Sequence, residues 1–225
     1  TMAMGWRSLC LGLWGAMLLV SFSTGCLNLL VRAPFHGAIV ATGVLLLGLA
    51  ILDWRGRPSR SAPRRREAAS WLLAALVAIA MVLIPPQPSF SDLAANRRGE
   101  PLAPEELSFV LPPAQRTLTD WVRLLVVEPD PRLYEGDPVR IQGFVLPMPD
   151  GPPQLARLLV RCCIADATPI ALPVRWPQSS PPPQADQWLA IEGVMGVETR
   201  AGQVRSLVIP SRIVPIARPA RPFEA

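Results

Sequence analysis

The first third of the chain contains three apolar stretches separated by short polar segments. Residues 9–31 and 35–52 hold no charged side chain, and residues 68–84 end at a Pro-Pro pair. A helix of 23 residues is about 34 Å long, which is enough to cross the roughly 30 Å of hydrocarbon in a bilayer. We therefore expect three transmembrane helices at these positions, forming a membrane domain over residues 1–84.

The first stretch has a second interpretation, a lipoprotein signal cleaved before Cys26. The residues before it read Ser-Thr-Gly, which resembles the small-residue end of such a signal. A mature lipoprotein continues with a polar linker, whereas residues 27–31 read LNLLV. The sequence therefore favours a continuous span over cleavage.

The arginines predict how these spans are oriented. Six arginines lie in the loop of residues 53–67, and Arg7 precedes the first span. Short loops rich in arginine stay on the cytoplasmic side of a membrane. We therefore expect a multi-pass protein of the plasma membrane with a cytoplasmic N-terminus and everything after residue 84 outside the cytoplasm.

The second half of the chain shows a different pattern. Residues 85–116 read as a proline-rich linker, and residues 119–127 as a short helix capped by Thr119. Period-two alternation and turn residues then predict five strands, near residues 139–145, 155–163, 169–176, 188–197 and 204–216. Residues 117–225 thus indicate a small all-β domain, with a five-stranded OB-like barrel as the first interpretation and a flattened sandwich as the alternative. The whole chain is expected to be an α + β membrane protein.

Charge and composition exclude several functions. The net charge of +5 comes from residues 1–84, because residues 85–225 carry fourteen arginines against fifteen acidic residues. No basic face is left outside the membrane to bind nucleic acid. The chain has no lysine, no G-x-S-x-G or H-E-x-x-H motif, and His36 as its only histidine. We therefore expect no enzymatic activity and no nucleic-acid partner.

The strongest chemical signal is the adjacent pair Cys162 and Cys163. If the strand of residues 155–163 continues through the pair, Cys162 shares the core face with Ala156, Leu158 and Val160. Cys163 then lies on the other face beside Arg157 and Arg161, where positive charge favours a thiolate.

Three interpretations of this pair stay open. The cysteines are packing residues, or both thiols bind a soft metal or form a vicinal disulfide, or Cys163 bonds to another protein. Binding a metal requires the strand to break at Cys163, and Asp166 is then a third ligand or the cap of the turn. The candidate ligand or redox residues are Arg161, Cys162, Cys163 and Asp166. No complete zinc site can be written, because His36 lies between the first two spans, and the cofactor stays unknown.

Five segments stand out along the chain: the span exit at residues 84–86, the stretch SFSDLAANRRG at 89–99, GDPVRIQGFV at 136–145, RCCIADA at 161–167 and WLAIEG at 188–193. Together they resemble the YcgQ-like family of uncharacterised bacterial membrane proteins. The resemblance implies a bacterial inner-membrane protein that assists a larger polytopic permease of the YraQ-like kind.

We accordingly expect an accessory, non-enzymatic subunit of a permease complex for a small solute or ion. Its partners would be that permease, the lipid bilayer and a further copy of the chain, since three helices alone do not easily enclose a selective path. The alternative function is a membrane-anchored thiol protein that binds a soft metal or exchanges disulfides through Cys162 and Cys163.

Overall fold

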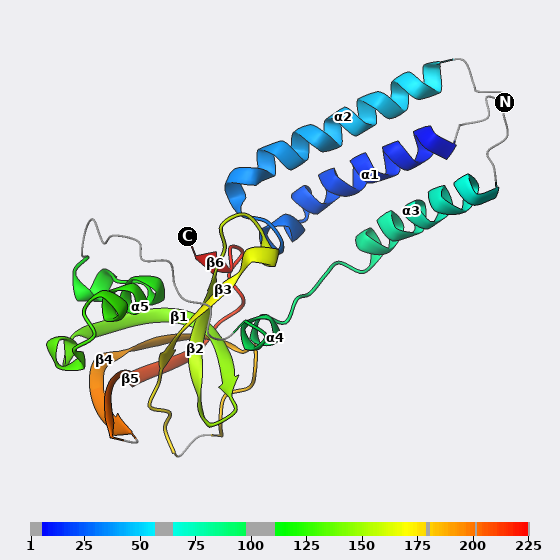
Figure 1. Ribbon diagram of the computed structural model, residues 1–225. Helices are drawn as coiled ribbons and strands as arrows, with labels where there is room; N and C mark the ends of the chain where they lie inside the picture. Colours follow the sequence, from blue (N-terminus) through cyan, green and yellow to red (C-terminus); the bar gives the residue numbers. More distant parts are fainter. Residues whose placement is uncertain (1–5, 57–64, 98–110, 179–180, 201, 225) are drawn as a thin grey trace. The chain divides into compact units, whose positions relative to one another are not determined.

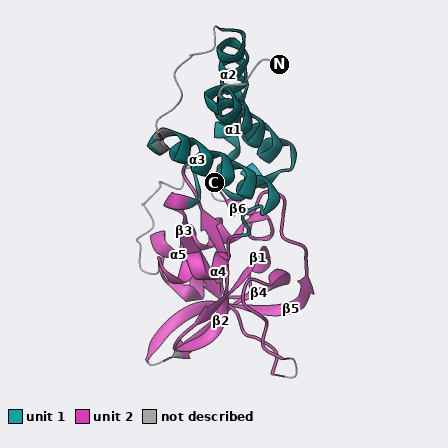
Figure 2. Cartoon of the chain, turned by 90° about the vertical axis from the view of Figure 1, so that its right-hand side faces the viewer, with its two compact units in different colours: residues 1–87, 162–164 teal, residues 88–161, 165–225 magenta. Residues whose placement is uncertain are grey.

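The computed structural model describes residues 6–56, 65–97, 111–178, 181–200 and 202–224 (Figure 1). Two compact units make up the chain (Figure 2). The helical unit holds residues 1–87 and 162–164, and the β unit holds residues 88–161 and 165–225. Two parts of the sequence predictions, residues 57–64 of the cytoplasmic loop and residues 98–110 of the linker, lie outside the described residues.

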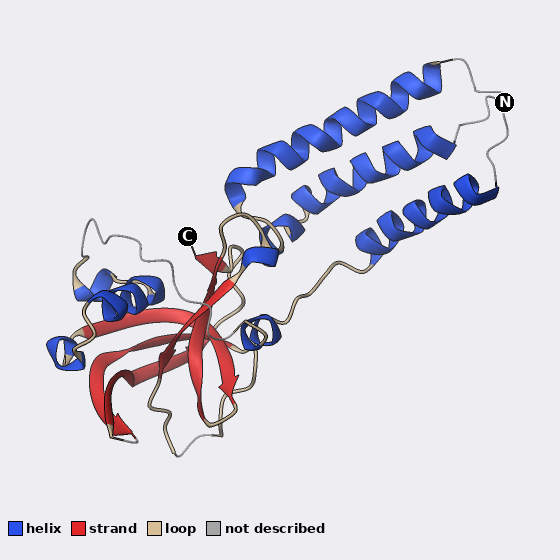
Figure 3. Ribbon diagram, viewed as in Figure 1, coloured by secondary structure: helices blue, strands red, loops and turns tan. Residues whose placement is uncertain are grey.

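The helical unit is built from three apolar α-helices, which Figure 3 shows in blue. They are α1 (Trp6–Ser23), α2 (His36–Arg55) and α3 (Arg65–Leu83). Helices α1 and α2 approach closely at Gly15, where an added Cβ would lie 2.8 Å from the carbonyl oxygen of Gly43. Helix α3 is joined to α1 by the Cys10 thiol, which donates to the carbonyl of Trp71 at 3.3 Å. Small residues thus let the first two backbones pack closely, as in membrane helix pairs.

Among the described residues, two helical segments are long and apolar enough to cross a membrane. These are Trp6–Ser23 and Ala33–Arg55, whereas the apolar part of α3, Ala68–Leu83, is shorter. Large apolar side chains on these helices are exposed, including Leu45 and Leu52 on α2. Length, composition and exposure support a membrane anchor in the N-terminal part of the chain.

The first apolar stretch is not the continuous helix over residues 9–31 that the sequence predicted. Helix α1 ends at Ser23, and Gly25 adopts a left-handed φ of 75°. That conformation is costly for residues with a Cβ and ends a helix readily at glycine. A short 3₁₀ helix, η1 (Cys26–Leu29), follows before the chain reaches a second one, η2 (Ala33–Phe35), and α2.

The β unit contains one sheet with the order β3-β2-β1-β4-β5 and antiparallel neighbours. Its strands are β1 (Pro138–Met148), β2 (Gly151–Leu159), β3 (Thr168–Pro173), β4 (Trp188–Arg200), β5 (Gln203–Pro215) and β6 (Phe223–Glu224). The sixth strand, which the sequence did not predict, pairs in parallel with β2. A single parallel bridge, Val174 to Val208, joins the end of β3 to β5. The α + β class is therefore confirmed, but the sheet has six strands among the described residues, and no continuous ladder there closes it.

Strand β1 bends from one neighbour to the other. Its first half pairs with β4 and its second half with β2, so that Phe144 has both Trp188 and Ala156 as register partners. The side chains of Val139, Ile141 and Val145 are buried as their alternation predicted, yet Phe144 on the other face is also fully buried. Both faces of β1 are covered at this bend.

Two helices complete the β unit. Helix α5 (Leu118–Val127) begins one residue before the predicted start, and its cap is Thr117 rather than Thr119. The backbone N–H of Asp120 donates to the Thr117 hydroxyl, and the Asp120 carboxylate accepts from the Thr117 N–H in a reciprocal capping box. Helix α4 (Phe90–Ala95) lies within the segment that the sequence assigned to a linker. Its first residue, Phe90, is 2% exposed.

Candidate functional site

Cys162 and Cys163 lie in the loop between β2 and β3, residues 160–167, here called the thiol loop. Strand β2 ends at Leu159, and a 3₁₀ helix, η5 (Ile164–Asp166), occupies the end of the loop. The carboxylate of Asp166 accepts the backbone N–H of Arg161 at 2.8 Å. This hydrogen bond closes a turn around both cysteines, so Asp166 caps the turn as one of its two predicted roles requires.

The structure contradicts the prediction that Cys162 is a buried core thiol. Cys162 is exposed and Cys163 is half-buried. The physical reason is that β2 stops three residues before the pair, so strand alternation no longer decides which way the two side chains face. The break in the strand is the condition that the sequence set for both thiols to serve one ligand.

The thiol pair and Asp166 bring three donor atoms together. Cys162 donates to the Cys163 sulfur at 3.6 Å, and the two Sγ atoms and a carboxylate oxygen of Asp166 lie within 4.8 Å of one another. In a tetrahedral zinc site with Zn–S bonds of about 2.3 Å, two sulfur ligands are roughly 3.8 Å apart. The thiols therefore already stand close to the separation at which one metal ion binds both.

The backbone of the cysteine pair is fixed within the helical unit, to which residues 162–164 belong. The N–H of Arg32 donates to the carbonyl of Cys162 at 2.9 Å, and the N–H of Ile164 donates to the carbonyl of Leu30 at 2.8 Å. These bonds form an antiparallel bridge between Val31 and Cys163. The pair is therefore held by this two-bond bridge to the segment that joins α1 to α2.

The other candidate ligands lie elsewhere. His36 Nε2 is 2.9 Å from the carbonyl oxygen of Val31, so its ring N–H serves a backbone acceptor. Cys10 is buried on α1 and Cys26 lies in η1. The side chain of Arg161 is exposed. Among the described residues, the only group of three or more ligand-type side chains is therefore Cys162, Cys163 and Asp166.

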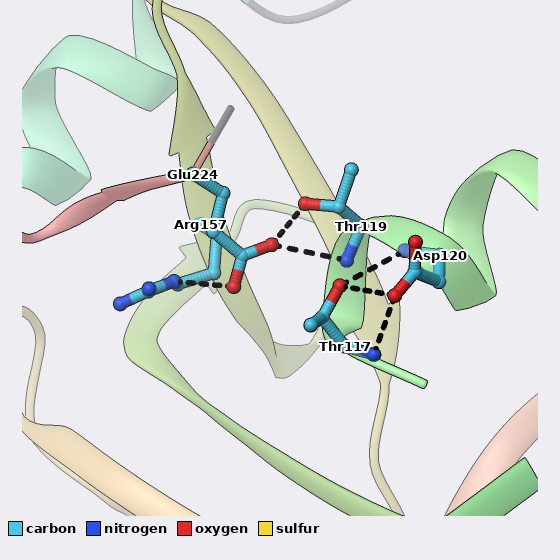
Figure 4. Close-up of polar contacts among 5 residues, drawn as sticks. All are labelled: Thr117, Thr119, Asp120, Arg157 and Glu224. Atoms are coloured by element: carbon cyan, nitrogen blue, oxygen red, sulfur yellow. Dashed lines mark hydrogen bonds and ion pairs between the residues drawn. The ribbon is translucent and has the colours of Figure 1, made fainter. Parts of the chain in front are cut away.

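Arg157, which the sequence placed on the face of Cys163, is instead buried in the β unit. Its residue exposure is 5%, and its Nε donates to the Glu224 carboxylate at 2.9 Å. The other carboxylate oxygen of Glu224 accepts from the N–H of Thr119 at 3.2 Å and from the Thr119 hydroxyl (Figure 4). Sequence reasoning missed this cluster, because Glu224 follows Arg157 by 67 positions and no local pattern links the two.

Comparison with known protein families finds a match over most of the β unit. Residues 118–223 match the model of the DUF1980 C-terminal domain. The match runs from α5 to β6, includes the thiol loop, and covers just under half of the chain. No curated protein and no solved structure matches the chain. The DUF1980 description names no activity, so any functional conclusion depends on the chemistry of the site.

Proposed function

We propose that the chain is a membrane-anchored thiol protein that binds one soft metal ion through Cys162 and Cys163, with Asp166 as the third ligand. The observation that carries the proposal is the gathering of three donor atoms within 4.8 Å, including two sulfurs at 3.6 Å. Thiolates select soft or borderline ions such as Zn²⁺, Cd²⁺ and Cu⁺ over Mg²⁺ and Ca²⁺. The two backbone hydrogen bonds with Leu30 and Arg32 order the pair before metal binds, which lowers the entropy cost of binding.

Metal binding is favoured over a vicinal disulfide. The Cα atoms of adjacent residues are about 3.8 Å apart, shorter than the 4.4–6.8 Å of ordinary disulfides. A disulfide between Cys162 and Cys163 would therefore distort the backbone that the hydrogen bonds to Leu30 and Arg32 hold. A metal ion can bind both sulfurs with little movement, because their 3.6 Å separation is close to the roughly 3.8 Å between two sulfur ligands of a tetrahedral zinc ion.

The ligand count indicates an exchangeable site. Three protein ligands leave one position open on a tetrahedral ion, whereas closed structural zinc sites use four. Cys162 is exposed, so an exogenous ligand has access to that position. We therefore infer that the bound ion is passed on rather than kept.

The finer architecture forms part of the same proposal. We propose that α3 is a third span, that the arginine-rich loop before it faces the cytoplasm, and that the β unit lies outside. What supports this is the apolar composition of α3, whose large side chains such as Leu72, Leu73 and Leu76 are exposed, together with the arginine bias. We also propose an OB-like barrel, supported by the strand order and by the parallel bridge between Val174 and Val208.

A second candidate function is an accessory subunit of a polytopic permease, of the YraQ-like kind implied by the family resemblance. The observation that favours it is the small number of apolar helices among the described residues, which is too few to enclose a selective path alone. The two functions are compatible, since a thiol site next to a permease would deliver its ion there. If the purified monomer transported a solute by itself in liposomes, the accessory role would be wrong.

The metal site is tested on the full chain in lipid nanodiscs, reduced and then titrated with Cd²⁺. The absorbance of the ultraviolet cadmium–thiolate charge-transfer band should increase until one equivalent of Cd²⁺ per chain has been added. The double variant Cys162→Ser/Cys163→Ser should lose the band, and Asp166→Asn should bind more weakly. The matched control Cys10→Ser/Cys26→Ser removes the other two thiols of the chain and should bind like the wild type. Equal binding by the Cys162→Ser/Cys163→Ser chain, or no saturable band in the wild type, would refute the proposal.

A further inference from the structure

Strand β6 occupies a gap that the bend of β1 leaves beside β2. The register of β1 along β2 ends at the pair Phe144–Ala156, whereas β3 pairs with β2 as far as Leu159. One edge of β2 is therefore left open by β1 beyond Ala156. Residues 223 and 224 fill it by pairing in parallel with Leu158 and Leu159. This is strand addition to an exposed sheet edge, the way many proteins bind extended peptides.

The gap ends in a site for a carboxylate. Glu224 places one oxygen on Arg157 Nε and the other on Thr119 in the first turn of α5 (Figure 4). The positive end of the helix dipole favours an anion at that position. The side chains of Arg157 and Glu224 are only 6% and 15% exposed, so the pair is largely shielded from water. Charge-assisted hydrogen bonds of this kind are stronger than neutral ones.

Aromatic rings from α4, β1 and β4 form a cluster with Phe223 in the rest of the gap. The ring of Phe223 lies 5.8 Å from that of Phe90, which in turn lies 5.7 Å from Phe144 and 5.9 Å from Trp188. Pro222, one residue earlier, is fully buried. The segment is thus held by burial of Pro222, ring packing of Phe223 and charged hydrogen bonding of Glu224.

The guanidinium of Arg157 has a hydrogen-bond donor that its ion pair with Glu224 does not use. Its Nη1 is buried and has no hydrogen-bond partner among the residues that the structure describes, while the guanidinium lies 5.2 Å above the ring of Trp188. Only two register pairs hold the segment to β2, and residues 217–222 before it form no strand or helix. The segment is therefore short and weakly paired, and it follows a stretch of chain that is free of regular structure.

We infer that the edge of β2 beyond Ala156, with the carboxylate contacts and the aromatic rings beside it (together called the groove), is a peptide-binding site, and that residues 222–224 of a second copy of the chain exchange with the chain's own segment there. We choose this partner because the groove already holds the extended segment Pro222-Phe223-Glu224, and every copy of the chain carries the same segment. Exchange of an identical element costs little, because the same hydrogen bonds and ring packing that leave one chain form again between two. The groove thus links two copies through their β units, independently of the thiol loop.

The first test uses a labelled peptide of residues 216–225 and the full chain in detergent. The chain Phe223→Ala/Glu224→Gln, whose own segment no longer fits, should bind one peptide saturably by fluorescence anisotropy. Wild-type chain should bind it more weakly, because its own segment competes. A peptide carrying Glu224→Gln should bind the emptied chain at least about ten-fold more weakly, through loss of the charged acceptor. If the emptied chain does not fold, the single variant Glu224→Gln takes its place. A folded chain that ignores the peptide would overturn the inference.

The second test asks whether copies exchange. In sedimentation experiments, the fraction of wild-type chain present as a dimer should rise with protein concentration. This dimer fraction should be smaller for the variant Phe223→Ala/Glu224→Gln. Arg221→Ala, an exposed change one residue outside the segment, should leave the dimer intact and serves as the control. Equal dimer fractions in the wild type and the emptied chain would overturn the second copy as occupant. Cys162→Ser/Cys163→Ser should dimerise normally, which separates this result from failure of the metal proposal.

Discussion

Replacing Phe90 with alanine should unfold the β unit at a much lower temperature, although the residue lies in a segment that looked like a linker. Phe90 is 2% exposed, and its ring lies within 6 Å of the rings of Phe144, Trp188 and Phe223. Truncating a buried phenylalanine to alanine costs about 3–5 kcal/mol. The β unit has about 135 residues, for which that loss lowers Tm by about 10–18 °C.

Thermal unfolding of the full chain in detergent, followed by near-ultraviolet circular dichroism, measures this shift. Phe90→Leu keeps part of the apolar volume and should show a smaller drop. Val127→Ala on α5, where the side chain is exposed, is the surface control and should barely change Tm. If Phe90→Ala shifted Tm by no more than Val127→Ala does, α4 would not be part of the folded β unit and the reasoning would fail.

Two further predictions concern the β unit. Burial, and then the charge of Glu128, raise the pKa of Tyr134 above its ordinary value, so the folded state favours the protonated phenol. The resulting stability is complete below pH about 10 and is lost as the pH rises through the higher folded pKa; Tyr134→Phe should abolish this loss. Tyr134 is the only tyrosine, so tyrosinate absorbance reports it alone, and a folded-state midpoint at or below the ordinary value would contradict the prediction. Gly193→Ala should destabilise the fold by several kcal/mol, because its Cβ would lie 2.1 Å from the carbonyl oxygen of Ile209, where Gly193 faces a bulge in β5. Urea unfolding measures the loss, and Gly37→Ala, with open space around the new Cβ, should show none of it.

The strands of the β unit could largely be predicted from alternation, but their surroundings could not. Val139, Ile141 and Val145 are buried as expected. Alternation puts Phe144 on the opposite face, yet Phe144 is buried too, because α4 covers the second face of the bend. Which face of a strand is covered depends on segments far away in sequence, and period-two patterns contain no information about them.

The candidate site shows the same limit. The sequence located Cys162, Cys163 and Asp166, since an adjacent cysteine pair is rare and conspicuous, but it placed Cys162 in the core. The error came from extending β2 past Leu159 on apolar character alone, whereas pairing with β3 ends there. The burial of Arg157 was also unpredictable, because only its long-range partner Glu224 makes a buried guanidinium tolerable.

The backbone hydrogen bonds that link Leu30 and Arg32 to the thiol loop determine which truncated forms of the protein would keep that loop intact. A chain cut after residue 87 would retain every strand of the sheet and both of its helices. It would nevertheless lose the backbone partners of Cys162 and Ile164, so these two hydrogen bonds would no longer restrain the thiol loop. Metal affinities measured on residues 88–225 alone would describe a more flexible binding loop than that of the whole protein, and the intact chain in lipid is the appropriate sample.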